Sequence, residues 1–274
     1  MRADLHMHTT ESDGRLTREA LFKRAEQSLV DIIAITDHDT CLHVKDNHRL
    51  AKQHSLTYIP GIELSTLYEG KSVHLLGYFR DNSYQSSSML DYYAYIKNGR
   101  EQRAQKFIKN LKTHFNIHIT YEDVLAVSHG IIGRPHLAKA IMNRYQQYTH
   151  KEIFDKFIGD HTKAYVPSTE LHLEEGLALL RKHDILVSLA HPKLLKSHIH
   201  DHVLAYDYDA IEAIYGINTP EETKMYKKIA EKSGLLITAG SDFHGIENDK
   251  DHAELGSVAL ENDALKKFLK AMQL

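Results

Sequence analysis

The sequence contains a single cysteine, Cys41, among its 274 residues, and this scarcity excludes an internal disulfide framework. We interpret Cys41 as a buried residue near the start of a helix rather than as a metal ligand or a nucleophile. No run of 18 apolar residues occurs, so no membrane-spanning helix is expected. No signal-peptide pattern is found either, and together with the lone thiol this favours a reducing, cytoplasmic location.

An excess of charge of either sign is missing as well. Lys and Arg number 34 against 37 Asp and Glu, which gives a formal net charge of −3. This balance provides no strong global field that would favour nucleic acid or an anionic membrane. Two catalytic signatures are also absent, the G-x-S-x-G nucleophile elbow and the glycine-rich P-loop. What remains is an ordinary globular composition, 42% hydrophobic and 26% charged, with enough length for one barrel-sized domain and an insertion.

Two histidines near the N-terminus are the first positive signal. His6 and His8 are separated by one apolar residue in the string Asp-Leu-His-Met-His. Side chains at positions i and i+2 of a strand point to the same face. The pair is therefore typical of half a metal site on a rigid strand, and Asp13 follows five residues later.

Five further segments share one arrangement, a short run rich in Ile, Leu and Val with ionisable residues within it or directly after it. Such runs, separated by helical stretches, indicate buried parallel strands in βα units. In a barrel of these units the chemistry lies at the C-terminal ends of the strands. The expected strands span residues 31–36, 56–62, 72–78, 185–190 and 235–239. The ionisable residues that accompany them are Asp37, His38, Asp39, Glu63, His74, His191, Asp242 and His244.

These positions form a set of six histidines and three carboxylates without a thiolate: His6, His8, Asp13, His38, Glu63, His74, His191, Asp242 and His244. Any one of these histidines alone is more often a core or surface residue. Gathered at one rim, they instead predict a metal cluster, and imidazole with carboxylate suits Zn²⁺, Mn²⁺ or Fe²⁺. Nine ligands exceed the coordination of one ion, so two or three ions and a bridging carboxylate are expected.

The strings that hold these residues resemble the PHP (polymerase and histidinol phosphatase) superfamily. The resemblance implies a distorted (β/α)7, TIM-like barrel of the α/β class with up to three divalent metal ions. It implies that His6, His8, Glu63 and Asp242 hold a first ion. Glu63 would bridge to a second ion, which His74 and His191 complete, and Asp13, His38 and His244 would hold a third. The matching strings are His6-x-His8, Thr36-Asp37-His38-Asp39, Pro60-Gly61-Ile62-Glu63, Ala190-His191-Pro192 and Ser241-Asp242-x-His244.

More than a hundred residues separate His74 from His191, far more than one βα unit needs. We expect a long helix over residues 92–115 and shorter helices over 121–127, 135–148 and 151–158. Residues 100–167 are therefore predicted to form a helical cap over a barrel built from residues 1–99 and 168–274. Basic side chains recur every third residue on the long helix and wind around it, which favours a solvated helix over a nucleic-acid track. They are Lys97, Arg100, Arg103, Lys106, Lys109 and Lys112.

The cap contains the string Gly133-Arg134-Pro135-His136-Leu137-Ala138. Pro135 suits the first turn of a helix, and Arg134 beside that positive helix end indicates an anion site. The string resembles one PHP branch, which contains nucleoside-3′,5′-bisphosphate phosphatases and 5′-3′ exonucleases acting on very short oligonucleotides. The resemblance implies that Arg134 and His136 bind the substrate phosphate.

Two other groups of cationic side chains are interpreted as surface features. The His198-x-His200-x-His202 tract looks like a metal motif, but polar neighbours surround it and we expect a surface loop. Lys193 lies close to His191 in sequence, and we expect it to be exposed to solvent rather than bound to phosphate.

The predicted reaction is hydrolysis of phosphate esters by direct attack of metal-bound hydroxide, with His191 and His244 as supporting residues. The expected substrate is a nucleotide, as a 5′- or 3′,5′-bisphosphate, or a short oligonucleotide attacked from its 5′ end. No membrane and no obligate protein partner are expected.

Three alternative classes share part of this pattern. An amidohydrolase also begins with H-x-H but typically bridges its metals with a carboxylated lysine. A histidinol-phosphate phosphatase shares the cluster but is not expected to carry the G-R-P-H insertion. A non-catalytic metal-binding module, as attached to polymerases, often loses ligands, whereas this chain keeps the full set.

Overall fold

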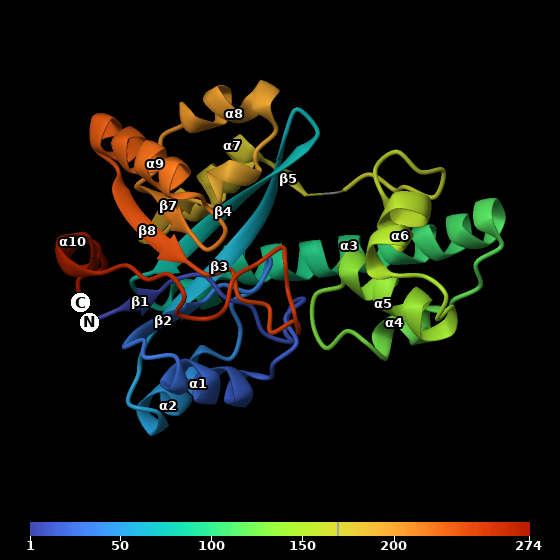
Figure 1. The fold of residues 1–274 in the computed structure, drawn as a ribbon, viewed down its shortest axis with the longest axis horizontal. Coiled ribbons are helices and arrows are strands. Elements are labelled where there is room, and N and C mark those ends of the chain that lie inside the picture. The colour runs from blue at the N-terminus through green and yellow to red at the C-terminus, as the bar shows by residue number, and fades with distance from the viewer. Residues whose placement is uncertain (169) are drawn as a thin grey trace.

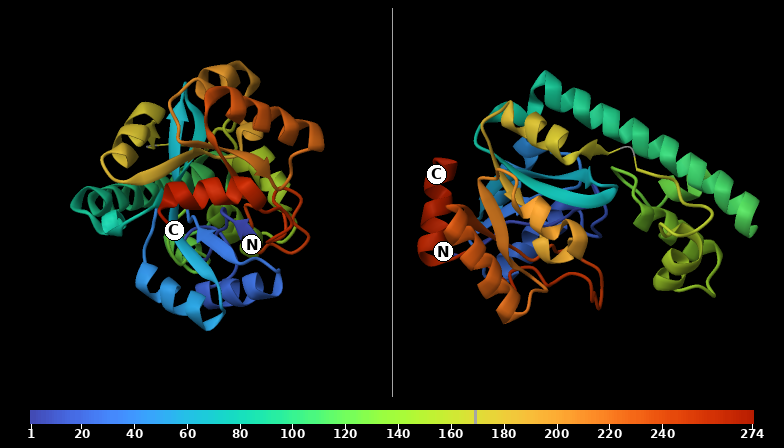
Figure 2. Two further views of the ribbon diagram at one scale, coloured as in Figure 1. Left: turned by 90° about the vertical axis from the view of Figure 1, so that its left-hand side faces the viewer. Right: turned by 90° about the horizontal axis from the view of Figure 1, so that it is seen from above.

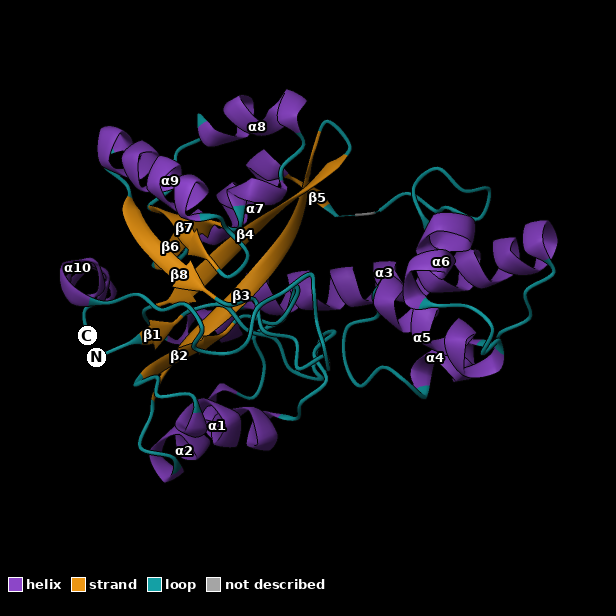
Figure 3. Cartoon of the chain, viewed as in Figure 1, coloured by secondary structure: helices purple, strands orange, loops and turns teal. Residues whose placement is uncertain are grey.

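A computed structural model describes residues 1–168 and 170–274. Seven strands form a nearly closed barrel with helices around it (Figure 1, Figure 3), which confirms the α/β barrel expected from the sequence. The barrel closes where the Leu5 N–H donates to the Ala239 carbonyl at 2.9 Å. In spatial order the strands are β1 (Ala3–Asp4), β2 (Ile32–Ile35), β3 (Thr57–Tyr68), β4 (Lys71–Phe79), β6 (Ile185–Leu189), β7 (Ala210–Tyr215) and β8 (Leu236–Gly240).

The strand directions differ from the all-parallel arrangement predicted for βα units. Strand β4 runs antiparallel to both of its neighbours, β3 and β6. Glu69 and Gly70 join β3 to β4 with φ angles of 49° and 71°, and a two-residue turn of this kind reverses the chain. The prediction is therefore wrong for β4, because no crossover helix precedes it. The hairpin pairs His74 with Ser65 and so returns His74 to the neighbourhood of Glu63.

Six helices pack on the outside of the barrel or across one end of it (Figure 2). Helix α10 covers the end at which both termini lie, because its apolar residues join the cluster that fills the barrel interior. In that cluster the rings of Tyr78 in β4 and Phe268 in α10 meet edge-on, with centroids 5.3 Å apart. The six helices are α1 (Arg18–Gln27), α2 (Val44–Gln53), α7 (Leu173–Arg181), α8 (Ser197–Leu204), α9 (Pro220–Ser233) and α10 (Asn262–Met272).

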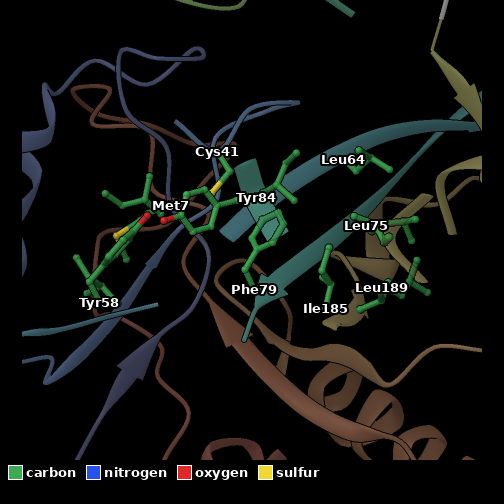
Figure 4. Packing of buried hydrophobic residues seen from close by; sticks show 14 of the residues in the cluster. Met7, Cys41, Tyr58, Leu64, Leu75, Phe79, Tyr84, Ile185 and Leu189 are labelled. Carbon is green, nitrogen blue, oxygen red and sulfur yellow. The ribbon is translucent and has the colours of Figure 1, made fainter. Parts of the chain in front are cut away.

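A second and larger apolar cluster lies between the strands and the surrounding helices (Figure 4). Its labelled members include Met7, Tyr58, Leu75 and Ile185, which come from separate strands or strand ends. Cys41 belongs to the same cluster and is only 5% exposed, as expected. Burial raises the pKa of the Cys41 thiol, so the group is held as an unreactive thiol rather than a thiolate.

The insertion is built on one long helix that leaves the barrel (Figure 1, Figure 2). This helix begins earlier than predicted, because the Ser86 hydroxyl accepts a hydrogen bond from Met89 N–H and caps it. The helices of the insertion pack around a third apolar cluster of their own. They are α3 (Ser87–Phe115), α4 (Tyr121–Leu125), α5 (Arg134–Arg144), α6 (His150–Ile153) and the π-helical turn η2 (Phe154–Ile158). Short elements elsewhere are η1 (Asn82–Gln85), β5 (Leu171–His172), which pairs with β3, and η3 (Pro192–Leu194).

Several side chains interpreted as solvated are in fact paired. Arg100 in α3 is buried against Asp39, with only 12% of its side chain exposed. Lys193 donates to the Ile217 carbonyl at 2.8 Å and to Glu222 at 2.7 Å. The tract from His198 to His202 lies in helix α8 rather than in a loop, because Ile199 and Val203 supply a buried face at helical spacing.

No helix among the described residues combines the length and apolar character needed to cross a membrane. The 29-residue helix α3 is long enough, but its sequence carries many charged residues.

Candidate metal centre

The first two candidate ligands lie just beyond the end of β1 rather than within it. His6 and His8 are both fully buried, and Met7 between them forms a bridge to Phe243. The chain then turns sharply, because Ser12 N–H and Gly14 N–H both donate to the Thr9 carbonyl. A Cβ atom on Gly14 would lie 2.6 Å from the His8 carbonyl carbon, so only glycine fits this turn.

Asp13 lies in this turn, the other candidate ligands come from the ends or edges of other strands, and the structure brings all nine together. His38 follows β2 and forms an isolated bridge with Glu63 of β3. His191 follows β6, and Asp242 follows β8 with a left-handed φ of 56°. The donor atoms of eight of the nine fall into overlapping groups, among them His6, His8, Glu63 and Asp242; His8, Asp13, His38 and His244; and His38, Glu63 and His74. His191 joins the centre through Glu63.

The group of His6, His8, Glu63 and Asp242, which we call group 1, has the most compact geometry. His6 Nε2 and His8 Nε2 lie 3.3 Å apart, and each lies 3.1–3.3 Å from Glu63 Oε2 and Asp242 Oδ1. Donor atoms in a tetrahedron about 2.0–2.1 Å from an ion are about 3.3–3.4 Å apart. The spacing therefore fits a single divalent ion.

Glu63 faces two sets of histidines with its two oxygens. Oε2 points to group 1 and to His38 Nδ1, which lies 3.1 Å away. Oε1 lies 2.8 Å from His74 Nδ1 and 2.9 Å from His191 Nε2. We call Glu63, His74 and His191 group 2. One carboxylate is thus shared between two groups, as a bridging ligand requires.

Asp13 is the centre of a looser set on the other side, which we call group 3. Its Oδ1 lies 3.3 Å from His244 Nε2 and 3.8 Å from His8 Nδ1, and its Oδ2 lies 3.8 Å from His38 Nε2. These distances are too long for good hydrogen bonds.

Buried polar atoms without a hydrogen-bond partner show that the donor set suits cations. Asp13 Oδ1, His38 Nδ1, Glu63 Oε2 and Asp242 Oδ1 are all buried and unpartnered among the described residues. Leaving such groups unpaired is costly, and carboxylate and imidazole donors are the ligands that divalent transition ions take. The residues present therefore fit bound divalent metal ions.

The pKa values of the carboxyl groups and of His8 also indicate a site for cations. Burial opposes ionisation of Asp13, but His244 and His38 hold its pKa well below the usual range. Burial also opposes ionisation of Glu63 and Asp242, but neighbouring histidines hold the pKa of each carboxyl group well below its usual range. Burial also works against the charge on His8, yet Asp242 and Glu63 raise its pKa to about 10. The carboxylates are thus ionised and depend on neighbouring positive charge.

Sequence reasoning missed Glu212, a fully buried carboxylate in the middle of β7. Its Oε1 lies 3.0 Å from His6 Nδ1, and its Oε2 accepts the backbone N–H of His191 at 2.8 Å. A carboxylate on the far nitrogen of a metal-binding histidine fixes the ring and its tautomer. The only sequence signal was an acidic residue inside the apolar string Ala-Ile-Glu-Ala-Ile-Tyr.

His252 was missed as well. Its ring stacks on that of His244 with centroids 4.0 Å apart, and its Nδ1 lies 2.9 Å from Asp249 Oδ2. With Asp242 and His244 it completes a further group of possible ligand atoms. It lies in an irregular segment after β8, where no strand pattern predicted it.

A cavity of about 820 Å³ opens over the centre and separates it from the insertion. Seven of the nine candidate ligands contribute to its floor. The rest of its lining combines cationic and apolar side chains, many of them from α5 and α6, with the acidic Glu247, Asp249 and Asp251. The cationic and apolar side chains include Arg15, Pro135, Lys139, Met142, His150 and Lys151.

Arg134 and His136 are not among the residues that line this cavity, although Pro135 between them is. Arg134 forms an ion pair with Asp160 at 2.5 Å and lies over the rings of Phe154 and Tyr165. His136 is buried, and its Nδ1 accepts a hydrogen bond from Gly133 N–H at 2.9 Å. Burial lowers the pKa of His136, so it is a neutral imidazole at pH 7.

Comparison with known proteins agrees with the geometry. Residues 4–167 match the family profile of the PHP domain. The 5′-3′ exoribonuclease Rnm of Salmonella typhimurium is 30% identical over 255 residues, covering 88% of this chain and 84% of the relative. The 3′,5′-nucleoside bisphosphate phosphatase of Chromobacterium violaceum is 24% identical over 250 residues, covering 88% and 86%.

A solved structure extends the likeness to three dimensions. A protein of Bifidobacterium adolescentis, assigned as a metal-dependent phosphoesterase, superposes with a TM-score of 0.82 at 26% identity. The superposition covers 98% of this chain and 96% of the other. The similarity therefore includes the insertion as well as the barrel.

Proposed function

This chain belongs to the PHP domain family and is a phosphoesterase, and from that premise we propose that it hydrolyses phosphate esters of nucleotides. The substrates we propose are nucleoside 5′- or 3′,5′-bisphosphates and short oligonucleotides attacked from the 5′ end. Relatives named for activity on ribonucleic acid and on nucleoside bisphosphates support this class.

One observation carries the proposal, namely the cavity between the ligand cluster and the insertion. Its volume of about 820 Å³ lies in the range typical of sites for small organic ligands. Arg15, Lys139 and Lys151 suit a second phosphate or the backbone of a nucleic acid, whereas Pro135 and Met142 suit a base or sugar. A small inorganic or aliphatic ester would leave most of this lining unused.

We propose that two or three divalent ions, Mn²⁺, Zn²⁺ or Fe²⁺, bind through the nine candidate ligands. Group 1 would hold one ion, group 2 would share Glu63 with it, and Asp13, His38 and His244 of group 3 would hold the outermost. When bound, such ions supply Lewis acidity, which activates water at neutral pH and neutralises charge on the phosphate.

The side chains of the centre have two roles in this proposal: they orient the ligands and they support the leaving group. Glu212 orients His6 and the backbone of His191, so that the ligand atoms are in place before the substrate arrives. His191 and His244 border the cavity, and we propose that they support the departing alkoxide wherever a ring nitrogen remains free.

The insertion, residues 100–167, is proposed to select the substrate, with Arg134 and His136 as phosphate contacts. The Arg134 guanidinium is held by two aromatic rings and is neutralised by Asp160, whose side chain is 63% exposed. A pair of this exposure contributes little stability, so a substrate phosphate can replace the Asp160 carboxylate at small cost. For His136, Nδ1 accepts the Gly133 N–H and the ring also bonds the backbone of Ser12, so a phosphate would compete with Ser12 for the other ring nitrogen.

A substrate panel tests the proposal. The Mn²⁺-loaded protein is assayed for phosphate release from adenosine 3′,5′-bisphosphate, 5′-phosphorylated di- and trinucleotides, histidinol phosphate and p-nitrophenyl phosphate. We expect kcat/KM to be highest for the nucleotides, and Glu63→Gln to abolish activity on all four classes. A preference for histidinol phosphate, or no release from any nucleotide, would sink the nucleotide assignment.

A further inference from the structure

The insertion touches the barrel loop that carries Asp13 through backbone atoms. Ile131 N–H donates to the Glu11 carbonyl at 2.9 Å. A Cβ atom on the preceding residue, Gly130, would lie 1.9 Å from that same carbonyl oxygen. These two segments of the chain are therefore in direct contact, and any side chain at Gly130 would force them apart.

Glu11 cannot move without displacing Asp13, because the loop between them is short and tied on its other side. The Ser12 hydroxyl donates to Asp37 Oδ1 at 2.6 Å, and Ser12 N–H donates to the Thr9 carbonyl at 3.1 Å. Asp37 also accepts the Thr9 N–H at 2.8 Å. Between these ties and the contact with Ile131, the loop has little freedom.

The insertion also reaches the second ligand loop, this time through α3. Arg100 forms a buried ion pair with Asp39 and donates to Ser65 Oγ at 3.0 Å. The Tyr92 hydroxyl, in the same helix, donates to Asp39 Oδ1 at 2.7 Å. Asp39 directly follows His38, is fully buried and has a left-handed φ of 55°. Its conformation, and with it the placement of His38, is held by these partners together with Ser65 N–H of β3, which donates to Oδ1 at 2.8 Å.

Both contacts converge on the same set of ligands. Asp13 and His38 belong to group 3, whose other members, His8 and His244, are backed by strand ends of the barrel. We propose that the insertion is a positioning element for the ion of group 3. The contacts at Gly130 and Arg100 hold Asp13 and His38 where they can share an ion. The inference rests on the proposed function in one respect, that an ion occupies group 3.

Gly130→Ala tests the first contact, and Gly133→Ala is its matched control in the same loop. The Cβ of the control would lie 3.2 Å from Pro135 Cδ and 3.9 Å from His136 Nδ1, so it displaces little. Asp13→Ala is the reference for loss of the group 3 ion. Each full-length variant is loaded with Mn²⁺ and desalted, bound manganese is counted by mass spectrometry, and folding is checked by circular dichroism.

We expect Asp13→Ala and Gly130→Ala each to lose about one ion per chain, while Gly133→Ala retains the parent content. Raising free Mn²⁺ by about 10- to 100-fold should refill the site in Gly130→Ala, because the ligands are present but misplaced. It should not refill Asp13→Ala. If Gly130→Ala keeps the ion content of the parent protein while Asp13→Ala loses an ion, the positioning role is wrong but the group 3 ion stands. If Asp13→Ala loses no ion, group 3 does not hold one, and the inference fails with that part of the proposed function.

A second pair of variants keeps the inference testable if Gly130→Ala does not fold. Arg100→Met removes the charge that faces Asp39, and Arg100→Lys keeps it with a different shape. We expect Arg100→Met to lose the same ion at low Mn²⁺ and Arg100→Lys to regain part of it. Equal ion content in both variants and the parent would contradict the role of α3.

Discussion

At the scale of single residues, the centre depends on groups that face two partners at once. Glu63 divides its oxygens between groups 1 and 2, and Glu212 divides its oxygens between His6 and the backbone of His191. Replacing such a residue disturbs two neighbours together.

Glu212→Gln is expected to weaken binding of the group 1 ion by about 10- to 100-fold. The amide keeps one acceptor oxygen where the carboxylate has two, so either His6 or His191 loses its partner. Titration against a chelator of known affinity measures the change. Ser188→Ala is the control, because Ser188 is buried in the same sheet and bonds Thr238 rather than a ligand. If Glu212→Gln binds the ion with unchanged affinity, Glu212 does not orient the ligands.

Proton release should accompany ion binding. Against the effect of burial, Asp242 and Glu63 raise the pKa of His8 to about 10, so this ring carries a proton at pH 7 in the ion-free protein. An ion takes only the neutral imidazole, so binding must expel that proton. The apparent affinity should therefore rise with pH between 6.5 and 8. Calorimetry in buffers of different ionisation enthalpy counts the protons, and an affinity independent of pH would show that His8 is already neutral.

At the scale of elements, the start of α5 and the segment after the turn η2 meet through an ion pair between Arg134 and Asp160. Arg134 lies over Phe154 and Tyr165 and pairs with this carboxylate. The phosphate contact that we propose for Arg134 would therefore compete with Asp160.

Two substitutions at this arrangement should act in opposite directions. Asp160→Asn frees Arg134 and is expected to lower KM for nucleotides several-fold. Arg134→Ala removes a charge-assisted contact worth about 1.5–3 kcal/mol, so kcat/KM for nucleotides should fall on the order of 10- to 100-fold. Activity on p-nitrophenyl phosphate and the ion content should change little in both. An equal loss on nucleotide and aryl phosphate in Arg134→Ala would instead assign Arg134 to the chemical step or the fold.

At the scale of the whole molecule, the barrel has two apolar clusters and the insertion has one of its own, and the centre lies where barrel and insertion face one another. Because ligands come from strands distributed around the barrel, bound ions crosslink segments that are distant in sequence. The ions should therefore stabilise the fold as well as serve the reaction.

Removal of the ions should lower the melting temperature. A ligand present at about 100 times its Kd stabilises the folded state by about 2.7 kcal/mol, which corresponds to about 5–10 °C for a chain of this size. Calorimetric melting of chelator-treated protein, followed by readdition of Mn²⁺, measures the shift. Equal melting temperatures with and without ions would mean that the centre is already stable without them.

The sequence alone determined the chemistry of the ligand set and the α/β class. The polar residues after apolar runs were recognisable because a strand end is a local property, whereas His6 and His8 lie beyond β1 and not on the strand that was predicted to hold them. The helices of the insertion followed from local periodicity as well. Cys41 was expected to be buried near the start of a helix, and it is buried three residues before α2.

Only the tertiary structure decided which of these residues meet and what supports them. Arg100 reads as one charge among several on a helix, yet it is buried against Asp39, 61 residues away. Glu212 reads as an interruption in a strand, and its partners His6 and His191 are 206 and 21 residues away. Pairings over such separations depend on how the strands close into a barrel and where the insertion docks. That is set by the packing of the whole chain, which no local pattern records.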